Sequence, residues 1–148
     1  LELLGGAGLL TGLDRYSCSR VGRRGSSPKL LALNNALITA LRPDDAEEPE
    51  VRGRLIETAV GAHLLRGAQA SGFELSWWRE ANREVDFVMR KGRSLVAIEV
   101  KSGRRRDSLP GLDLFASRHS AARRLLVGGD GIDLEDFLLA EPERWFPD

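Results

Sequence analysis

Residues 84–101, EVDFVMRKGRSLVAIEVK, carry the clearest structural pattern in the chain. The second half of this stretch, residues 94–101, is almost entirely apolar until Glu99, which is typical of a strand that is buried on both faces. Gly92-Arg93 can join the two halves, since a type II′ turn prefers glycine at its first central position. The first half alternates as a half-buried strand does, with apolar side chains at Val85, Phe87 and Met89. The sequence therefore predicts an antiparallel hairpin with a two-residue turn.

The turn also sets the pairing register of this hairpin. With two residues in the turn, Asp86 falls opposite Glu99, and Glu84 falls opposite Lys101. Because side chains alternate along a strand, we expect these four polar side chains on one face of the sheet. A three-residue loop would instead separate the two carboxylates.

Two carboxylates directly across a β-ladder repel each other, and beside an apolar strand they need a compensating cation. Magnesium is the natural candidate, because it binds hard oxygen ligands and often takes one or two carboxylates plus water and a substrate phosphate. Lys101 lies two residues beyond Glu99, where its ammonium can hold an attacking water or meet developing charge. Such a set is a phosphodiester-hydrolysis site in outline. The alternative from the residues alone is a polar hairpin face, with Asp86 and Glu84 solvated and Glu99 paired with Lys101.

Around the hairpin, apolar spacing and turn residues predict four further elements. These are a helix from Pro49 to about Gly67, a strand from Phe73 to Arg79, a helix from Leu109 to Ser120, and a strand from Leu125 to Val127. The order helix, strand, strand, strand, helix, strand predicts an α/β domain with a mixed β-sheet flanked by helices.

Residues 1–48 are expected to form a short helical lead-in, and residues 49–148 the main domain. Within the lead-in we expect a helix end over Leu1–Leu10, a polar loop or irregular hairpin over Asp14–Pro28, and a short strand running into a helix over Lys29–Leu41. An acidic, proline-bounded linker, Arg42–Pro49, would separate the two parts.

The amino-acid composition indicates the class of protein but says little about its function. The 148 residues are 42% hydrophobic and 30% charged, as in a globular domain. No apolar run approaches the roughly 20 residues of a membrane span, so we expect a cytoplasmic domain without membrane contact. The 22 basic residues balance the 22 acidic ones, so net charge gives no support to nucleic-acid binding. Cys18 is the single cysteine, and the chain begins with Leu1, so we expect a fragment of a longer protein without an internal disulfide.

The ordered set Glu57, Asp86, Glu99 and Lys101 resembles the PD-(D/E)xK nuclease superfamily, with the run EVDFV at 84–88 and IEVKSG at 98–103. Almost the whole chain is similar to a domain that follows AAA-type ATPase domains in bacteria and archaea, the domain of unknown function 4143. That resemblance implies a restriction-endonuclease-like core. One departure is Asn34, where the relatives often have aspartate.

The resemblance also implies roles for individual residues. Asp86 and Glu99 would bind the metal, together with the Val100 carbonyl, and Lys101 would position or activate the water. Glu57 would be the acidic residue of the helix, which contacts the metal directly or through water. The alternative for Glu57 is a surface glutamate on an amphipathic helix.

The function expected from these residues is magnesium-dependent hydrolysis of DNA, with manganese as a substitute ion. Arg104, Arg105 and Arg106 follow the second strand and are expected to contact the phosphate backbone, unless they form only a solvated basic loop. The ATPase domain of the same full-length chain would be a partner, and a homo-oligomer is compatible with the pattern. The alternative function is a catalytically silent DNA-binding, regulatory or oligomerisation domain of that ATPase.

Overall fold

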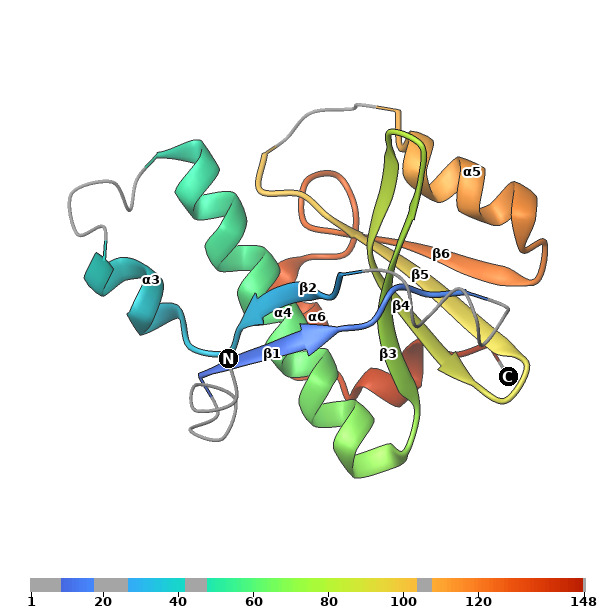
Figure 1. Cartoon of the computed structure of the whole chain (residues 1–148), viewed down its shortest axis with the longest axis horizontal. Coiled ribbons are helices and arrows are strands. Elements are labelled where there is room, and N and C mark those ends of the chain that lie inside the picture. Colours follow the sequence, from blue (N-terminus) through green and yellow to red (C-terminus); the bar gives the residue numbers. More distant parts are fainter. Residues whose placement is uncertain (1–8, 18–26, 42–47, 104–107, 148) are drawn as a thin grey trace.

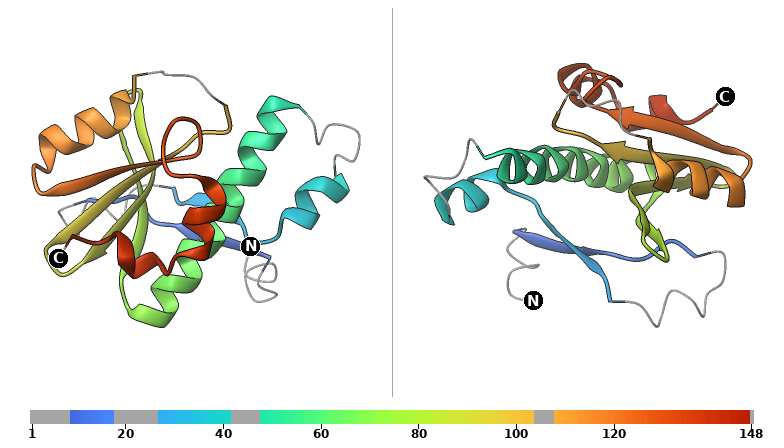
Figure 2. Two further views of the ribbon diagram at one scale, coloured as in Figure 1. Left: turned by 180° about the vertical axis from the view of Figure 1, so that it is seen from behind. Right: turned by 90° about the horizontal axis from the view of Figure 1, so that it is seen from above.

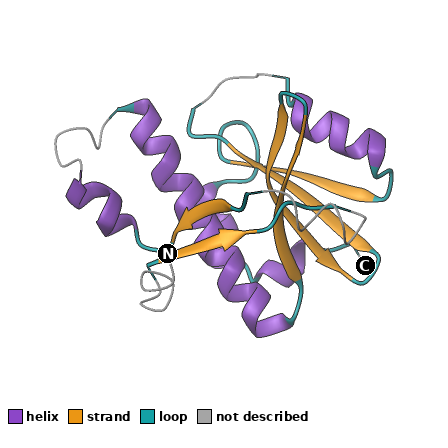
Figure 3. Ribbon diagram, in the orientation of Figure 1, coloured by secondary structure: helices purple, strands orange, loops and turns teal. Residues whose placement is uncertain are grey.

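A computed structural model of the chain describes residues 9–17, 27–41, 48–103 and 108–147. These residues form a four-stranded sheet flanked by helices and a separate two-stranded sheet (Figures 1 and 3). The predicted α/β class with a mixed sheet is confirmed. The elements are β1 (Leu10–Leu13), β2 (Lys29–Ala32), α3 (Asn35–Leu41), α4 (Pro49–Ser71), β3 (Glu74–Glu80), β4 (Arg83–Lys91), β5 (Ser94–Val100), α5 (Pro110–Arg118), β6 (Ala122–Val127), α6 (Leu134–Leu139) and the short 3-10 helix η1 (Pro142–Trp145).

The large sheet has the strand order β3-β4-β5-β6. The first three strands are antiparallel neighbours, whereas β5 and β6 run parallel and are joined through α5. Gly92 has φ 60 and opens the predicted two-residue turn between β4 and β5. The pairs of this hairpin run from Lys91–Ser94 to Phe87–Ile98, which confirms the predicted register. The ladder ends one pair short of Asp86 and Glu99.

Two hydrophobic clusters fill the two sides of the large sheet. On one side, Val60 and Leu64 of α4 pack against strand residues that include Phe87 and Ile98. On the other side, Leu112 and Phe115 of α5 pack against the remaining apolar side chains of the same strands. The view from above in Figure 2 shows α4 and the β1–β2 sheet as separate layers.

Helix α4 is one turn longer than the sequence predicted. We expected it to end near Gly67, but it continues to Ser71 and is closed by Gly72, whose φ of 71 is the left-handed geometry favoured at this position. Gly67 lies inside the helix. A glycine is needed at this position because a Cβ there would be 2.5 Å from the Pro142 ring. It allows close packing with η1 and does not end the helix.

The lead-in contributes strands to the structure as well as a helix. The prediction of a helix end over Leu1–Leu10 is wrong at Leu10, which begins β1; residues 1–8 lie outside the described part. The predicted strand and helix over Lys29–Leu41 are confirmed as β2 and α3. Leu13 of β1 and Leu31 of β2 are buried in the cluster that contains Val60 of α4. The domain boundary between residues 48 and 49 stays a prediction.

The C-terminal elements α6 and η1 were not predicted. Asp133 caps α6 by accepting hydrogen bonds from the backbone of Glu135 and Asp136, and Phe137 of this helix is fully buried. Strand β6 begins at Ala122, three residues earlier than expected, because its first half carries arginines instead of an apolar run. Among the described helices, none combines the length and apolar character needed to cross a membrane.

Candidate functional site

Strand β2 docks on α4 through a glycine. A Cβ on Gly61 would lie 2.7 Å from Leu31 and 2.9 Å from the Phe87 ring, so this approach requires the absence of a side chain. Lys29 precedes Leu31 by two residues and therefore shares its side of β2. Glu57 precedes Gly61 by about one helical turn and shares its side of α4. The contact between the two elements thus brings Lys29 to Glu57.

The ammonium of Lys29 is surrounded by three carboxylates. Its Nζ lies 2.7 Å from Glu57 Oε1, 3.0 Å from Glu84 Oε1 and 3.5 Å from Asp86 Oδ1. It also lies 5.9 Å from the centroid of the Phe87 ring. The ammonium donates hydrogen bonds to Glu57 and Glu84 and forms a longer ion pair with Asp86. We call Lys29, Glu57, Glu84 and Asp86 the lysine cluster.

A β-bulge in β4 turns Asp86 toward this cluster. Where the β3–β4 register shifts, one residue of β3 faces two residues of β4, Asp86 and Phe87. Val85 and Val88, which lie three positions apart, both pack on the α5 side, whereas Phe87 packs on the α4 side. The strict alternation along β4 that underlay the one-face prediction is therefore wrong at this point. Bulges redirect side chains in this way and are frequent beside active sites.

Asp86 also closes the end of the β4–β5 ladder. Its Oδ2 accepts a hydrogen bond of 2.9 Å from the backbone N–H of Val100. Next to it, Lys101 donates a hydrogen bond of 2.8 Å to Glu99 Oε1. The second oxygen, Glu99 Oε2, is buried and has no hydrogen-bond partner among the described residues. Asp86 therefore links the lysine cluster to the strand that carries the Glu99–Lys101 pair.

The charges at this end of the sheet perturb one another. Burial, together with the neighbouring charges of Glu99 and Glu57, raises the pKa of Asp86 to about 7 against the opposing effects of Lys29 and the Val100 N–H. Burial alone would lower the pKa of Lys29, but its contacts with Glu57, Asp86 and Glu84 outweigh burial and raise that pKa. Four carboxylates here face two ammonium groups, so negative charge is in excess.

The side chains present have the chemistry of a divalent-cation site without its complete geometry. Within residues 9–17, 27–41, 48–103 and 108–147, no three Asp, Glu, His or Cys side chains converge closely enough to hold one metal ion. Two carboxylates are sufficient for magnesium when water and phosphate complete its shell. The buried Glu99 Oε2, without a partner among the described residues, fits such an ion, and Asp86, whose pKa the Glu99 charge raises, is a second carboxylate beside it.

The structure brings together most of the predicted site residues in two groups. Glu57 and Asp86 meet at Lys29, while Glu99 and Lys101 pair with each other. Val100 contributes its N–H to Asp86. The predicted phosphate contacts, Arg104, Arg105 and Arg106, lie outside the described residues.

Lys29 was not predicted from the sequence as a site residue. The signal for it was a single lysine at the start of an apolar strand, two positions before the buried Leu31. A charged side chain on the buried face of a strand requires a partner of opposite charge. Glu57 is 28 positions away in sequence, so no local pattern identified it as that partner.

The two histidines pack against aromatic rings. His63 contacts the Phe137 ring and the Ala140 carbonyl, with Nε2 at 3.0 Å from that oxygen. His119 lies with its ring centroid 4.5 Å from that of Phe115. Burial lowers the pKa of both histidines. These contacts agree with packing roles.

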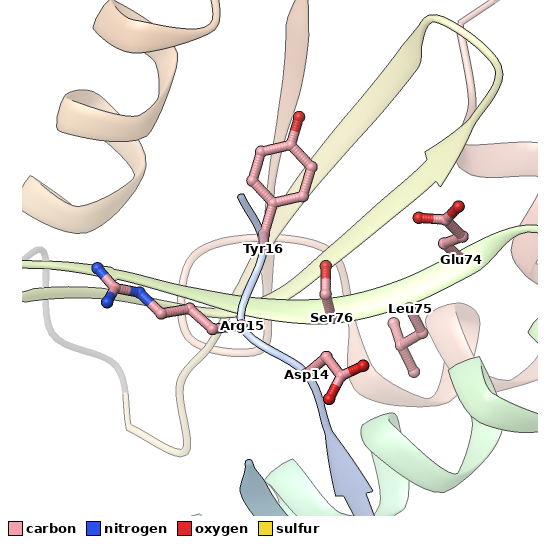
Figure 4. A pocket seen from close by; sticks show the side chains of 6 residues that line it. All are labelled: Asp14, Arg15, Tyr16, Glu74, Leu75 and Ser76. Atoms are coloured by element: carbon pink, nitrogen blue, oxygen red, sulfur yellow. The ribbon is translucent and has the colours of Figure 1, made fainter. Parts of the chain in front are cut away.

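A cavity of about 210 Å³ lies along the edge strand β3. The chain after β1 runs along this edge, where Tyr16 donates its N–H to the Trp77 carbonyl at 2.6 Å. Figure 4 shows the lining side chains, with Arg15 directed away from the others. The six residues that line the cavity are Asp14, Arg15, Tyr16, Glu74, Leu75 and Ser76, and none belongs to either charged group described above.

Fold and site together define a small α/β domain with an acidic site where a β-hairpin opens. The chain belongs to the family described as Domain of unknown function (DUF4143), which matches residues 52–139, more than half of its length. The predicted resemblance to this family is confirmed, and the assignment to the PD-(D/E)xK superfamily stays a prediction. No curated protein and no solved structure matches the chain. The matched segment contains Glu57, Asp86, Glu99 and Lys101, whereas Lys29 precedes it.

Proposed function

We propose that this domain is a metal-dependent DNA phosphodiester hydrolase of the PD-(D/E)xK type. The observation that carries the proposal is the Glu99 carboxylate, whose Oε2 is buried without a hydrogen-bond partner among the described residues. A buried acceptor without a partner is unfavourable, and a hard cation shared with Asp86 would satisfy it. The excess of carboxylates over ammonium groups at this end of the sheet favours the same ion.

In this proposal Asp86, Glu99 and the Val100 carbonyl hold magnesium, for which manganese can substitute. When bound, the ion supplies Lewis acidity at the phosphate and lowers the pKa of a coordinated water. Lys101 is oriented by its 2.8 Å hydrogen bond to Glu99, and its ammonium would hold the attacking water or meet the developing phosphate charge. Glu57 acts from the helix as an outer acidic group.

The reaction is the addition of water to a phosphodiester. The water oxygen forms a bond to phosphorus, one P–O bond to a sugar breaks, and the proton passes to the leaving oxygen through solvent. The products are a phosphate monoester and a free hydroxyl group. Arg104, Arg105 and Arg106 would bind the flanking phosphates, since a guanidinium can contact phosphate with two hydrogen bonds.

The resemblance on which this proposal draws also assigns a place in a longer protein. We propose that the domain forms the C-terminal part of an AAA-type ATPase and works with that ATPase domain, in a homo-oligomer if the ATPase assembles. A phosphate-binding loop of the form G-x-x-x-x-G-K-[ST] encoded upstream of Leu1 would support this, and its absence from the full-length chain would contradict it.

The test separates metal binding from cleavage. Calorimetric titration with Mn²⁺ should detect one site in the wild-type chain and none in Asp86→Asn. Lys101→Met should keep the ion but lose at least about a hundredfold in cleavage of labelled DNA, the usual effect of removing one electrostatic donor. Asp113→Asn is the matched control, because Asp113 is an exposed aspartate paired with Arg124 on another surface. A wild-type chain that binds no divalent cation would overturn the proposal.

A second function is favoured by Lys29. Because its ammonium contacts three carboxylates, the cluster is partly neutralised without a metal ion, which is compatible with a catalytically silent DNA-binding, regulatory or oligomerisation domain. Metal binding without cleavage of single-stranded, double-stranded or branched DNA would favour this second function.

A further inference from the structure

Lys29 reaches the acidic site from a different sheet. It opens β2 of the two-stranded sheet, whereas Glu84 and Asp86 lie on β4 of the large sheet and Glu57 lies on α4. Figure 1 shows β2 in front of α4, with the start of the strand on the side of the large sheet. The ammonium is thus a cation delivered to the carboxylates by the lead-in.

The position of this ammonium conflicts with a metal ion. Lys29 lies within 3.5 Å of Asp86 Oδ1, and the other Asp86 oxygen accepts the Val100 N–H. Both oxygens of the carboxylate that is expected to bind metal are therefore engaged. A divalent ion on Asp86 would stand close to a like charge at low solvent exposure, and the two cations would repel each other.

The lysine side chain can leave without disturbing the strand. Leu31 anchors β2 in the core with 4% exposure, while Pro28 before Lys29 is exposed. A lysine side chain has four flexible methylene groups, so its ammonium can move into solvent while the backbone stays fixed. The lysine side chain is 22% exposed, so this route is already partly open.

We propose that Lys29 is an internal competitor of the divalent cation. Its ammonium and the metal ion bind Asp86 in exchange, so that the metal ion displaces Lys29 and Lys29 lowers the affinity for the ion. This inference rests on the proposed metal site and adds a residue that determines its affinity. Lys29 is a positioning residue here, since it acts on the carboxylates and not on the substrate.

The first experiment is a Mn²⁺ titration of wild type, Lys29→Met and Lys29→Arg by calorimetry. We expect Lys29→Met to bind Mn²⁺ at least tenfold more tightly than wild type, and Lys29→Arg to stay near wild type because it keeps the charge. Lys91→Met is the matched control, since Lys91 also forms an ion pair, with Glu143, but lies far from Asp86. Equal affinity in wild type and Lys29→Met would overturn the inference and leave the proposed function intact.

The second experiment needs no variant. Amine acetylation of the wild-type chain, followed by mass spectrometry, should modify Lys29 faster when Mn²⁺ is saturating, with Lys91 unchanged. If Lys29→Met does not fold, this measurement decides alone, and an unchanged rate at Lys29 overturns the inference. Binding by Lys29→Met but not by wild type would support the competition and contradict hydrolysis by the native chain. Absence of binding in both would overturn the inference and the proposed function together.

Discussion

The two ends of the β4–β5 hairpin differ in how they handle charge. At the turn end the strands pair in regular register, and the cations Arg90 and Lys91 each have an acidic partner, Glu74 and Glu143. At the open end a bulge interrupts β4, and one ammonium, from Lys29, serves three carboxylates. At the turn end each of these two cations has its own carboxylate, whereas the open end concentrates excess negative charge in a partly buried place. Function is expected at the end where the charges do not balance.

The largest expected effect comes from the core beneath the bulge. Phe87→Ala should destabilise the domain by about 3–5 kcal/mol, because Phe87 is fully buried and its ring supports both Gly61 and Lys29. Met89→Ala, nearer the turn, should cost about 2–5 kcal/mol. Urea unfolding measures both, and acetylation should be faster at Lys29 only in Phe87→Ala. Equal acetylation in the two variants would contradict the link between the bulge and Lys29.

A smaller effect is expected from removing the cation of the lysine cluster. Lys29→Met leaves Glu57, Glu84 and Asp86 without their shared partner, and we expect a loss of roughly 1–3 kcal/mol, below the range for fully buried pairs because the side chains keep some solvent contact. Urea unfolding without metal measures it. A loss of stability no larger than in Lys91→Met would mean that the lysines at the two ends of the hairpin contribute equally to stability.

The pKa of Asp86 predicts a pH dependence confined to the open end. A carboxyl whose pKa rises from 3.8 to about 7 on folding holds its proton more tightly in the folded state. This group therefore contributes stability that is fully present below pH 3.8 and is lost as the pH rises through about 7. Asp86→Asn should remove this decline from stability measured between these pH values; a pKa rise of this size corresponds to at most about 4 kcal/mol, and the partial exposure of the side chain reduces the effect. Asp113→Asn should retain the decline of stability with pH. If the decline also persists in Asp86→Asn, it does not arise from the Asp86 carboxyl.

The smallest effect is expected at the turn end. Lys91 and Glu143 form an exposed ion pair, and such pairs add little to stability and are screened by salt. Glu143→Gln should leave the urea midpoint almost unchanged, and 1 M NaCl should abolish any remaining difference. A clear loss of stability that does not depend on salt would show that the ion pair at the turn end also stabilises the domain. It would contradict the difference between the two ends of the hairpin.

The same contrast explains what the sequence could and could not predict. Gly92-Arg93 gave the register correctly, because turn length and strand pairing are local properties. The bulge escaped prediction because Asp86 and Phe87 look like any alternating pair, and only the partner strand shows the shift. The helix end was misplaced because Gly67 resembles a terminator until its contact with Pro142 is known. Lys29 was missed for the same reason, since its partners come from distant elements.

The contact between Lys29 and Glu84 joins residues 55 positions apart, and this separation has a consequence for how the chain folds. The β4–β5 hairpin closes locally, so its carboxylates gather early, while contacts between distant segments form late. We therefore expect the transition state for folding to carry unneutralised carboxylates at the open end. Refolding should accelerate with added salt, and Asp86→Asn should reproduce part of that acceleration in low salt. During folding, the carboxylates of the hairpin would therefore lack the Lys29 ammonium until β2 of the lead-in docks on α4.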